Sequence, residues 1–203
     1  TAYNMPFASR QMGPLNKMAL RKTIDAICQR HEAFRTTFAM TGEGPVQIVS
    51  PFRPPHWIEL DLSLRLPSEQ RRQEAARLVE EEANQPFDLE KGPLARFLLI
   101  EIEPEDHVLV LTMHHIIGDQ WSFGVIGSEF AFFYNAFSRG EVPSVKPIPL
   151  QYADYAVWQR RCLTDEWLSI QSDYWQKKLA GLSKVSLPTD YSRPTVQTFN
   201  GAH

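Results

Sequence analysis

Two neighbouring apolar stretches constrain the fold of this chain more than any other feature. Residues 95–102 and 107–113 are rich in Leu, Ile and Val, and a short polar turn joins them, which predicts a β-hairpin. In the second stretch both alternating sets of positions are apolar: Val108 and Val110 on one face, and Leu109, Leu111 and Met113 on the other. A strand that is apolar on both faces is covered on both faces, so we expect it at the centre of its sheet.

Helical periodicity surrounds this hairpin. It predicts a helix over 13–31, a helix capped by Ser68, and two helices near 152–162 and 165–180. A further helix follows the hairpin and carries an aromatic core stripe: Phe123, Ile126, Phe130, Phe133 and Phe137. Two further short strands are expected at Phe34–Phe38 and Val46–Val49, on either side of a Gly-rich turn. The expected fold class is therefore α+β, a mixed sheet with flanking helices.

Composition excludes several classes of protein. With 203 residues, 43% of them hydrophobic, the chain is long enough for one globular domain or one lobe of a larger domain. Its net charge of −3 and the interleaved charges of residues 69–82 argue against a nucleic-acid partner. Cys28 and Cys162 lie far apart, which fits a reducing compartment. No apolar run reaches the roughly 18 residues of a membrane helix, and no signal peptide is visible, so a cytoplasmic location without membrane contact is expected.

The sequence His114-His115-Ile116-Ile117-Gly118-Asp119 follows the central strand and is the strongest candidate for a reactive site. A neutral imidazole accepts a proton from an attacking amine, hydroxyl or thiol near neutral pH. Alternation along the strand groups His115 with Met113 and groups His114 with Thr112, without telling which face is open. A pair of satisfied core histidines fits the same residues, so both interpretations are open at this point. A metal site is not expected, because adjacent strand residues diverge and no further ligand set is apparent.

Asp119 and Arg35 form a candidate ion pair. An aspartate just beyond a buried strand is costly unless it is paired, and Arg35 lies between Phe34 and Phe38 on a predicted strand. A bidentate contact between the two side chains would fix the loop that carries His115. The alternative, in which both side chains simply reach solvent, is also open.

Four strings in the chain carry a family resemblance. HHIIGDQWS resembles the HHxxxDG active-site motif of condensation domains in nonribosomal peptide synthetases. The other three follow the order of the same family: RHEAFRTTF (30–38) resembles RHExLRTxF, YADYAVWQ (152–159) resembles YxDYAxW, and LPTDYSRP (187–194) resembles the segment that closes the first lobe. Together the four strings span nearly the whole chain.

The resemblance implies a fold and a domain organisation. The family fold is a pair of lobes like chloramphenicol acetyltransferase, which form a V with the active site in a tunnel between them. Residues 1–180 are then expected to be the amino-terminal lobe, with the family's first motif upstream of Tyr3 missing. Residues 181–203 are expected to cross over to a carboxyl-terminal lobe that this chain does not contain.

The resemblance also implies an activity. The amine of one carrier-bound aminoacyl thioester attacks a second carrier-bound acyl thioester and forms an amide. His115 matches the catalytic histidine, which either takes the amine proton or positions the amine. His114, Gln120, Trp121 and Ser122 belong to the supporting motif, and Arg35 and Asp119 match the family's structural ion pair. No cofactor is expected to bind directly, because the substrates arrive on 4′-phosphopantetheine. The implied partners are the donor and acceptor peptidyl carrier proteins, an adjoining adenylation domain and the second lobe.

One departure from the family pattern is Gln120, which stands where glycine is usual. Glutamine tolerates a positive φ poorly and narrows the space available to a substrate arm. We expect Gln120→Gly to leave folding intact and to change substrate preference. Two alternatives to the catalytic interpretation stay open: a non-catalytic docking lobe, and a stand-alone acyltransferase of the same fold that depends on coenzyme A. The isolated lobe is expected to be inactive, because half of the tunnel wall is absent.

Overall fold

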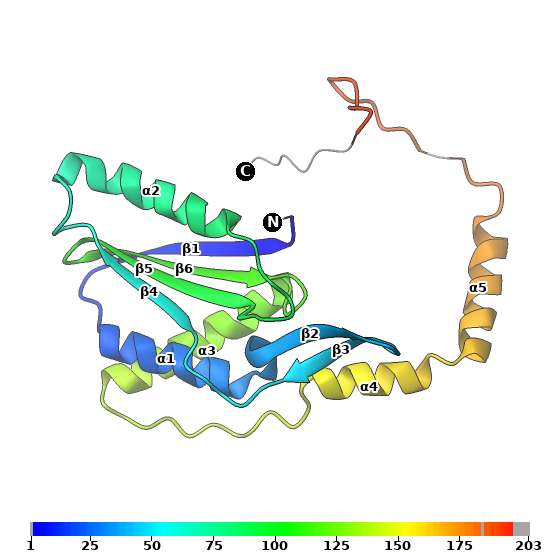
Figure 1. The fold of residues 1–203 in the computed structure, drawn as a ribbon, viewed down its shortest axis with the longest axis horizontal. Coiled ribbons are helices and arrows are strands. Elements are labelled where there is room, and N and C mark those ends of the chain that lie inside the picture. The colour runs from blue at the N-terminus through cyan, green and yellow to red at the C-terminus, as the bar shows by residue number, and fades with distance from the viewer. Residues whose placement is uncertain (1, 184, 197–203) are drawn as a thin grey trace. The chain divides into compact units, whose positions relative to one another are not determined.

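The computed structural model describes residues 2–183 and 185–196 (Figure 1). The chain divides into two compact units, one over Tyr3–Ala153 and one that begins at Asp154. The first unit contains six strands, three α-helices and a short 3-10 helix among its described residues: β1 (Asn4–Met12), α1 (Lys17–Arg30), η1 (Glu32–Arg35), β2 (Thr36–Thr41), β3 (Gly44–Val49), β4 (His56–Asp61), α2 (Ser68–Asn84), β5 (Ala95–Glu103), β6 (Asp106–His114) and α3 (Gln120–Ser138).

Four of these strands form a mixed sheet in the order β1-β6-β5-β4. The strands β5 and β6 form the predicted antiparallel hairpin, with Leu99 opposite Leu109. The strand β1 pairs antiparallel with the other side of β6, so β6 is an interior strand, as its two apolar faces predict. The strand β4 runs parallel to β5. The expectation of a mixed sheet in an α+β fold is therefore confirmed.

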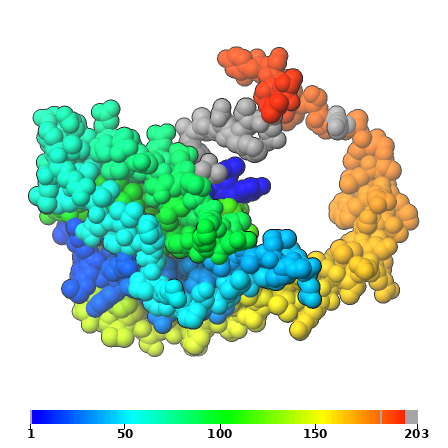
Figure 2. All heavy atoms as spheres, viewed as in Figure 1, coloured from blue at the N-terminus to red at the C-terminus, as the bar shows by residue number. Residues whose placement is uncertain are grey.

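Each face of the sheet has its own core. On one face α1 and α3 pack against Phe97, Leu99, Leu111 and Met113. On the other face α2 covers Leu98, Ile100 and Val110, and its side chains form an outer surface of this unit (Figure 2). The two cores use alternate residues of β5 and β6, because successive strand residues point to opposite faces. Three residues of the aromatic stripe of α3, Phe123, Ile126 and Phe130, pack against the first core. Phe133 is buried as well, and its ring stacks with that of Phe137.

The structure corrects several local expectations. The predicted strand Phe34–Phe38 is wrong in its first half, because η1 occupies Glu32–Arg35 and β2 begins only at Thr36. The hydroxyl of Thr36 donates to the carbonyl of Glu32 over 2.7 Å and closes this turn. Ser68 is not a cap but the first residue of α2, and it follows Pro67. The helix α1 begins at Lys17 rather than at residue 13. The residue before it, Asn16, caps the helix by accepting a hydrogen bond from the backbone N–H of Ala19.

The carboxyl-terminal part of the chain is helical as predicted. The helix α4 spans Tyr152–Cys162, and α5 spans Asp165–Leu179 with a capping hydrogen bond to Thr164. In the predicted crossover, residues 181–183 and 185–196 form no helix or strand, and residues 184 and 197–203 lie outside the described part. The boundary at residue 180 stays a prediction. Within the described residues, no helix has the length and apolar character needed to cross a membrane.

Candidate active site

Hydrogen bonds that the two histidine N–H groups donate to the residues just before β5 and β1 fix the backbone of the pair. The strand β6 ends at His114, whose N–H donates to the carbonyl of Leu94 over 2.9 Å, beside the start of β5. The N–H of His115 donates in the opposite direction, to the carbonyl of Tyr3 over 2.8 Å, beside the start of β1. A tight turn follows, in which the N–H of Ile117 donates to the carbonyl of His114. The turn is therefore anchored to both strands that flank the central strand.

The ring of His114 is half-buried between aromatic side chains. It lies 6.0 Å from the ring of Phe87, nearly perpendicular to it, and 5.9 Å from the ring of Tyr3. Its Nδ1 atom accepts a hydrogen bond from the N–H of Ile116 over 3.1 Å, which places the proton of the neutral ring on Nε2. Burial and the neighbouring His115 both lower the pKa of His114. The ring is therefore neutral near pH 7 and fills a packing role.

The ring of His115 has a different environment. It is exposed, and it lines an open hollow with Tyr3, Leu89, His114 and Ile116. Within the described part of the chain its side chain forms no hydrogen bond or ion pair, so both ring nitrogens are available to an incoming group. Alternation along the strand left open which histidine is accessible, and the structure exposes His115.

Asp119 and Ser122 fix the start of the helix that follows the histidines. The Oδ1 atom of Asp119 accepts hydrogen bonds of 2.9 Å from both the N–H and the hydroxyl of Ser122, and the hydroxyl accepts one from the N–H of Asp119. This reciprocal arrangement is a capping box. The hydrogen bonds from Ser122 lower the pKa of the Asp119 carboxyl. The supporting residues Asp119 and Ser122 therefore act on the backbone of α3.

The predicted ion pair between Arg35 and Asp119 is not formed. The guanidinium of Arg35 donates instead to the carbonyl of Ser50 over 2.6 Å and to the carboxylate of Glu32 over 3.0 Å. Because Arg35 lies in η1, Glu32 is only three residues away and supplies a local partner. The carboxylate of Asp119 is already engaged by the helix cap. Arg35 therefore ties η1 to the end of β3 rather than to the histidine turn.

Gln120 and Trp121 are the first two residues of α3, and both are exposed. In the part of the chain that the structure describes, only glycines adopt a positive φ, so Gln120 has an ordinary backbone conformation. The concern that this position requires glycine for its backbone angles is therefore removed. The effect of the glutamine side chain on substrate preference stays a prediction. Trp121 is 83% exposed and presents a large ring beside the turn.

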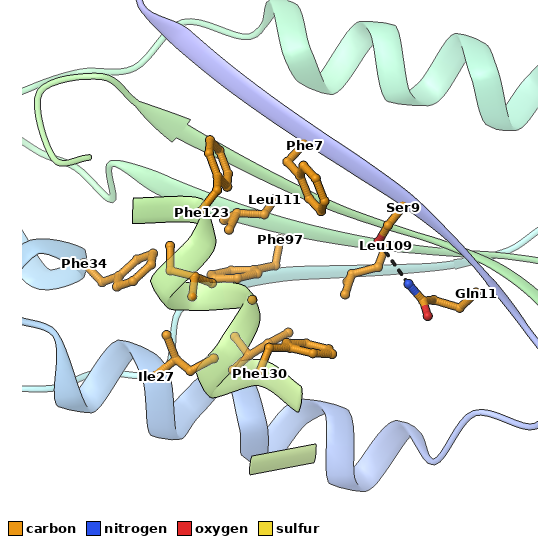
Figure 3. Close-up of a pocket in the computed structure, with 13 residues that line it drawn as sticks. Phe7, Ser9, Gln11, Ile27, Phe34, Phe97, Leu109, Leu111, Phe123 and Phe130 are labelled. Atoms are coloured by element: carbon orange, nitrogen blue, oxygen red, sulfur yellow. Dashed lines mark hydrogen bonds between the residues drawn. The ribbon is translucent and has the colours of Figure 1, made fainter. Parts of the chain in front are cut away.

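An apolar cavity of about 280 Å³ lies between the sheet and the helices α1 and α3 (Figure 3). The rings of Phe7 and Phe123 lie against each other at one end of it, with centroids 5.5 Å apart, and a hydrogen bond from Gln11 to Ser9 lies at the other end. Leu109 and Leu111 of β6 also line it. These two leucines belong to the alternating set that includes Met113 and, beyond the strand, His115.

Sequence reasoning missed the residues that hold the histidine turn. Tyr3, Phe87 and Leu94 are distant in the sequence and belong to no motif, so no local signal could have identified them. Among the described residues no group of three or more His, Cys, Asp or Glu side chains is arranged to hold a metal ion.

The described residues thus combine a mixed sheet, helices on both of its faces and a histidine turn at the end of an interior strand. The family model of the condensation domain matches residues 1–203. The chain belongs to the condensation domain family.

Relatives and solved structures agree with this assignment. The chain is 44% identical to one of the proteins that make up the linear gramicidin synthase of Brevibacillus parabrevis over 201 residues, which is 98% of this chain and 3% of that protein. It is 41% identical to chondramide synthase of Chondromyces crocatus over 206 residues, which is 100% of this chain and 5% of that synthase. The chain therefore spans a small fraction of the length of these relatives.

Among solved structures, the complex of the X-domain and OxyB from teicoplanin biosynthesis matches with a TM-score of 0.79 at 30% identity. The match covers 96% of this chain and 42% of that chain. The starter condensation domain of rhizomide synthetase matches with a TM-score of 0.79 at 18% identity over 90% of this chain and 43% of that chain, which shows the fold. The predicted family and fold class are confirmed.

Proposed function

We propose that this chain forms part of a condensation domain that joins two carrier-bound thioester substrates through an amide bond, with His115 beside the reacting amine. The single observation that carries this proposal is the exposed ring of His115, which lines an open hollow while its backbone is fixed by β1. A rigid backbone with an accessible imidazole can hold a proton acceptor at a defined point. The family and the resemblance to peptide synthetases support this choice of reaction.

In the proposed step the acceptor amine attacks the carbonyl carbon of the donor thioester. A C–N bond forms, the C–S bond breaks, and the proton lost by the amine ends on the released thiol. An imidazole suits this transfer, because it can take the proton from nitrogen and return it to sulfur. If His115 instead positions the amine, its ring accepts a hydrogen bond from the amine without taking the proton.

The neighbouring residues have supporting roles in this proposal. His114 stays neutral and packs the turn against Phe87 and Tyr3, while Asp119 and Ser122 fix the point where α3 begins. Gln120 and Trp121 follow the turn as exposed residues, and in this proposal they contact the substrate arms. No cofactor binds directly: 4′-phosphopantetheine arms carry the substrates. The proposed partners are therefore the donor and acceptor carrier proteins, with an adenylation domain and a second lobe on the same synthetase.

A second candidate function, recruitment of another protein, is supported by a specific comparison. The X-domain from teicoplanin biosynthesis, 30% identical to this chain, was solved as a complex with OxyB. A lobe of this kind would dock a partner without using His115.

Substitution of His115 separates the two functions. In the complete condensation domain, His115→Ala should reduce amide formation between loaded carriers by roughly 10²- to 10⁴-fold, the usual contribution of a general acid or base. His115→Gln keeps a polar side chain but not the imidazole, and should be similarly impaired if proton transfer is the role. A thermal melt should show both variants folded. Unchanged amide formation in His115→Ala would contradict the catalytic proposal and favour recruitment.

A further inference from the structure

A second hollow, away from the histidine turn, is lined by basic side chains. Its volume is about 460 Å³, and its walls come from η1, the start of β2, residues 50–55, the first residue of β4 and residues 91–95. None of the side chains that line it is acidic. We call it the basic hollow; its cationic and titratable members are Arg35, Arg53, Lys91 and His56, and its hydroxyl groups belong to Thr36, Thr37 and Ser50.

Two of the basic side chains are free to bind a ligand. Arg53 and His56 are exposed, and neither side chain forms a hydrogen bond or ion pair with any residue that the structure describes. Lys91 is also exposed, with its ammonium 3.3 Å from the carboxylate of Asp88. An exposed pair of this kind is weak, so Lys91 can turn toward an anion at little cost.

Arg35 contributes a buried donor. Its two terminal nitrogens are engaged by Ser50 and Glu32, but its Nε atom is buried and has no hydrogen-bond acceptor. A buried donor without an acceptor destabilises the protein. The charge of Arg35 is paired with Glu32, so what Arg35 adds to the wall is an unsatisfied hydrogen-bond donor, and the unpaired positive charge comes from Arg53.

The rest of the wall is stiff and uncharged. Four prolines line the hollow and restrict its backbone: Pro51, Pro54, Pro55 and Pro93. Cys28 and Phe34 lie in the wall too, and burial raises the pKa of the Cys28 thiol, with a further rise from Asp25, so this thiol stays neutral. A rigid wall without carboxylates holds no competing negative charge beside the cations of the hollow.

The basic hollow adjoins the strand that anchors the histidine turn. Pro93 and Ala95 line the hollow, and the carbonyl of Leu94, between them, accepts the hydrogen bond from His114. The basic hollow and the histidine turn therefore lie at the same end of the sheet.

We propose that the basic hollow binds a phosphate-class anion, a phosphate monoester or diester. Arginine and lysine around an uncharged wall suit phosphate oxygens, which accept several hydrogen bonds at once. Under the proposed function, the anion that binds is the phosphate group of a 4′-phosphopantetheine arm. Free phosphate has the same chemistry and could bind in its place. Since the cations are largely exposed, binding weakens as salt concentration rises.

The test compares three probes on the complete condensation domain by calorimetric titration: 4′-phosphopantetheine, pantetheine and inorganic phosphate. We expect 4′-phosphopantetheine to bind about tenfold more tightly than pantetheine, the effect of one or two charge-assisted hydrogen bonds, and we expect added salt to remove the difference. Phosphate that binds, while 4′-phosphopantetheine binds no better than pantetheine, would support the anion site and assign free phosphate as its ligand.

Variants locate the site. Arg53→Gln and Lys91→Gln should each raise the dissociation constant of the phosphate-bearing probe several-fold, whereas Arg65→Gln should not. Arg65 is a matched control because it is exposed, has no side-chain partner among the described residues, and follows the opposite end of β4. Binding that is identical in all three variants, or no binding of either phosphate-bearing probe, would overturn the proposal. The titration is independent of catalysis, because His115→Ala should bind the probes as the parent domain does.

Discussion

His114 and His115 are consecutive residues, yet their surroundings give them different chemistry. The ring of His114 is half-buried beside Phe87 and Tyr3 and has a lowered pKa, whereas the ring of His115 is exposed to an open hollow. The end of a strand produces this difference, because alternate residues point to opposite faces and the chain then leaves the sheet. A histidine pair at such a position therefore supplies one structural ring and one accessible ring.

Asp119 provides a prediction at the residue scale. Asp119→Ala removes the acceptor for the N–H and hydroxyl of Ser122, so the first turn of α3 should fray and the melting temperature should fall. Asp119→Asn keeps an oxygen acceptor for Ser122, so its melting temperature should fall less than that of Asp119→Ala. Thermal melts of both variants at pH 7 check this order. Because hydrogen bonds lower the pKa of Asp119, its contribution should persist above the unfolded value near 4 and disappear as the pH falls through the folded value.

The asparagine variant also serves as the control for this prediction, since it cannot titrate. Its stability relative to the parent protein should improve as the pH falls toward 3. Equal melting temperatures for the alanine variant and the parent at pH 7 would show that the cap does not stabilise α3.

The candidate site could be predicted only in part from the sequence. His115 could be chosen as a candidate because it follows a strand whose apolar pattern is unambiguous, and because its neighbours match a family motif. The partner of Arg35 was not identifiable. From the sequence, several carboxylates could have paired with that guanidinium. The 3-10 turn that brings Glu32 to Arg35 was not expected, because the alternation of residues 34–38 is typical of a strand.

At the scale of elements, Arg96 joins α2 to the sheet. From β5 its guanidinium donates to the carboxylate of Glu82 over 2.6 Å and to the backbone carbonyls of Glu82 and Gln85, each over 3.1 Å. It also lies 3.8 Å from the ring centroid of Phe87. One buried side chain thus satisfies carbonyl groups at the end of α2, neutralises a buried carboxylate and packs against the ring that contacts His114.

Loss of this pair should be costly. Glu82→Gln leaves the charge of Arg96 buried without its counter-ion, so we expect a loss of about 3 kcal/mol in the free energy of unfolding, measured in urea. The side chains of Arg96 and Glu82 are only 9% and 4% exposed, which keeps solvent from screening the change.

Glu81→Gln is the matched control for this prediction. It lies next to Glu82 on the same helix, but its carboxylate pairs with Arg77 at the surface. Exposed pairs of this kind contribute little, so its unfolding curve should overlay that of the parent. Similar curves for the two glutamine variants would contradict a special role for Glu82.

The elements that sequence analysis missed share a physical cause. The strands β1 and β4 are both edge strands, and each has a partner on one side only. Their side chains are partly exposed, so apolar and polar residues are mixed without clear alternation. The interior strands β5 and β6 are largely buried and gave an unambiguous signal. Long-range pairing, rather than local preference, decides whether such edge segments become strands.

For the molecule as a whole, the pKa shifts predict loss of stability in acid. A hydrogen bond from Arg10 lowers the pKa of Asp106, and one from the hydroxyl of Ser63 lowers that of Asp61. Burial acts to raise the pKa of Glu129, but hydrogen bonds from His31 and Arg30 outweigh it. Carboxyl groups with a lowered folded pKa stabilise the protein above the unfolded value near 4, and this contribution is lost as the pH falls through the folded values.

The urea midpoint should therefore fall steadily between about pH 5 and pH 2. Asp106→Asn should flatten this dependence, because its neutral side chain gains nothing from ionisation. Glu43→Gln is the control: Glu43 is exposed in the β2–β3 turn, and its side chain forms no hydrogen bond within the described residues, so this change should leave the curve as it is. A midpoint that is constant over this range would contradict the linkage.

The position of β1 at the border of the sheet has a consequence for how copies of the chain meet. An unpaired strand border exposes backbone groups to which another chain can add a strand, the usual route to aggregation. Pro6 lacks an N–H, and Arg10 places a charge on the same strand, held by Asp106. Both features oppose the addition of a foreign strand. Pro6 and Arg10, which interrupt the apolar pattern of β1, therefore disfavour the pairing of two copies border to border.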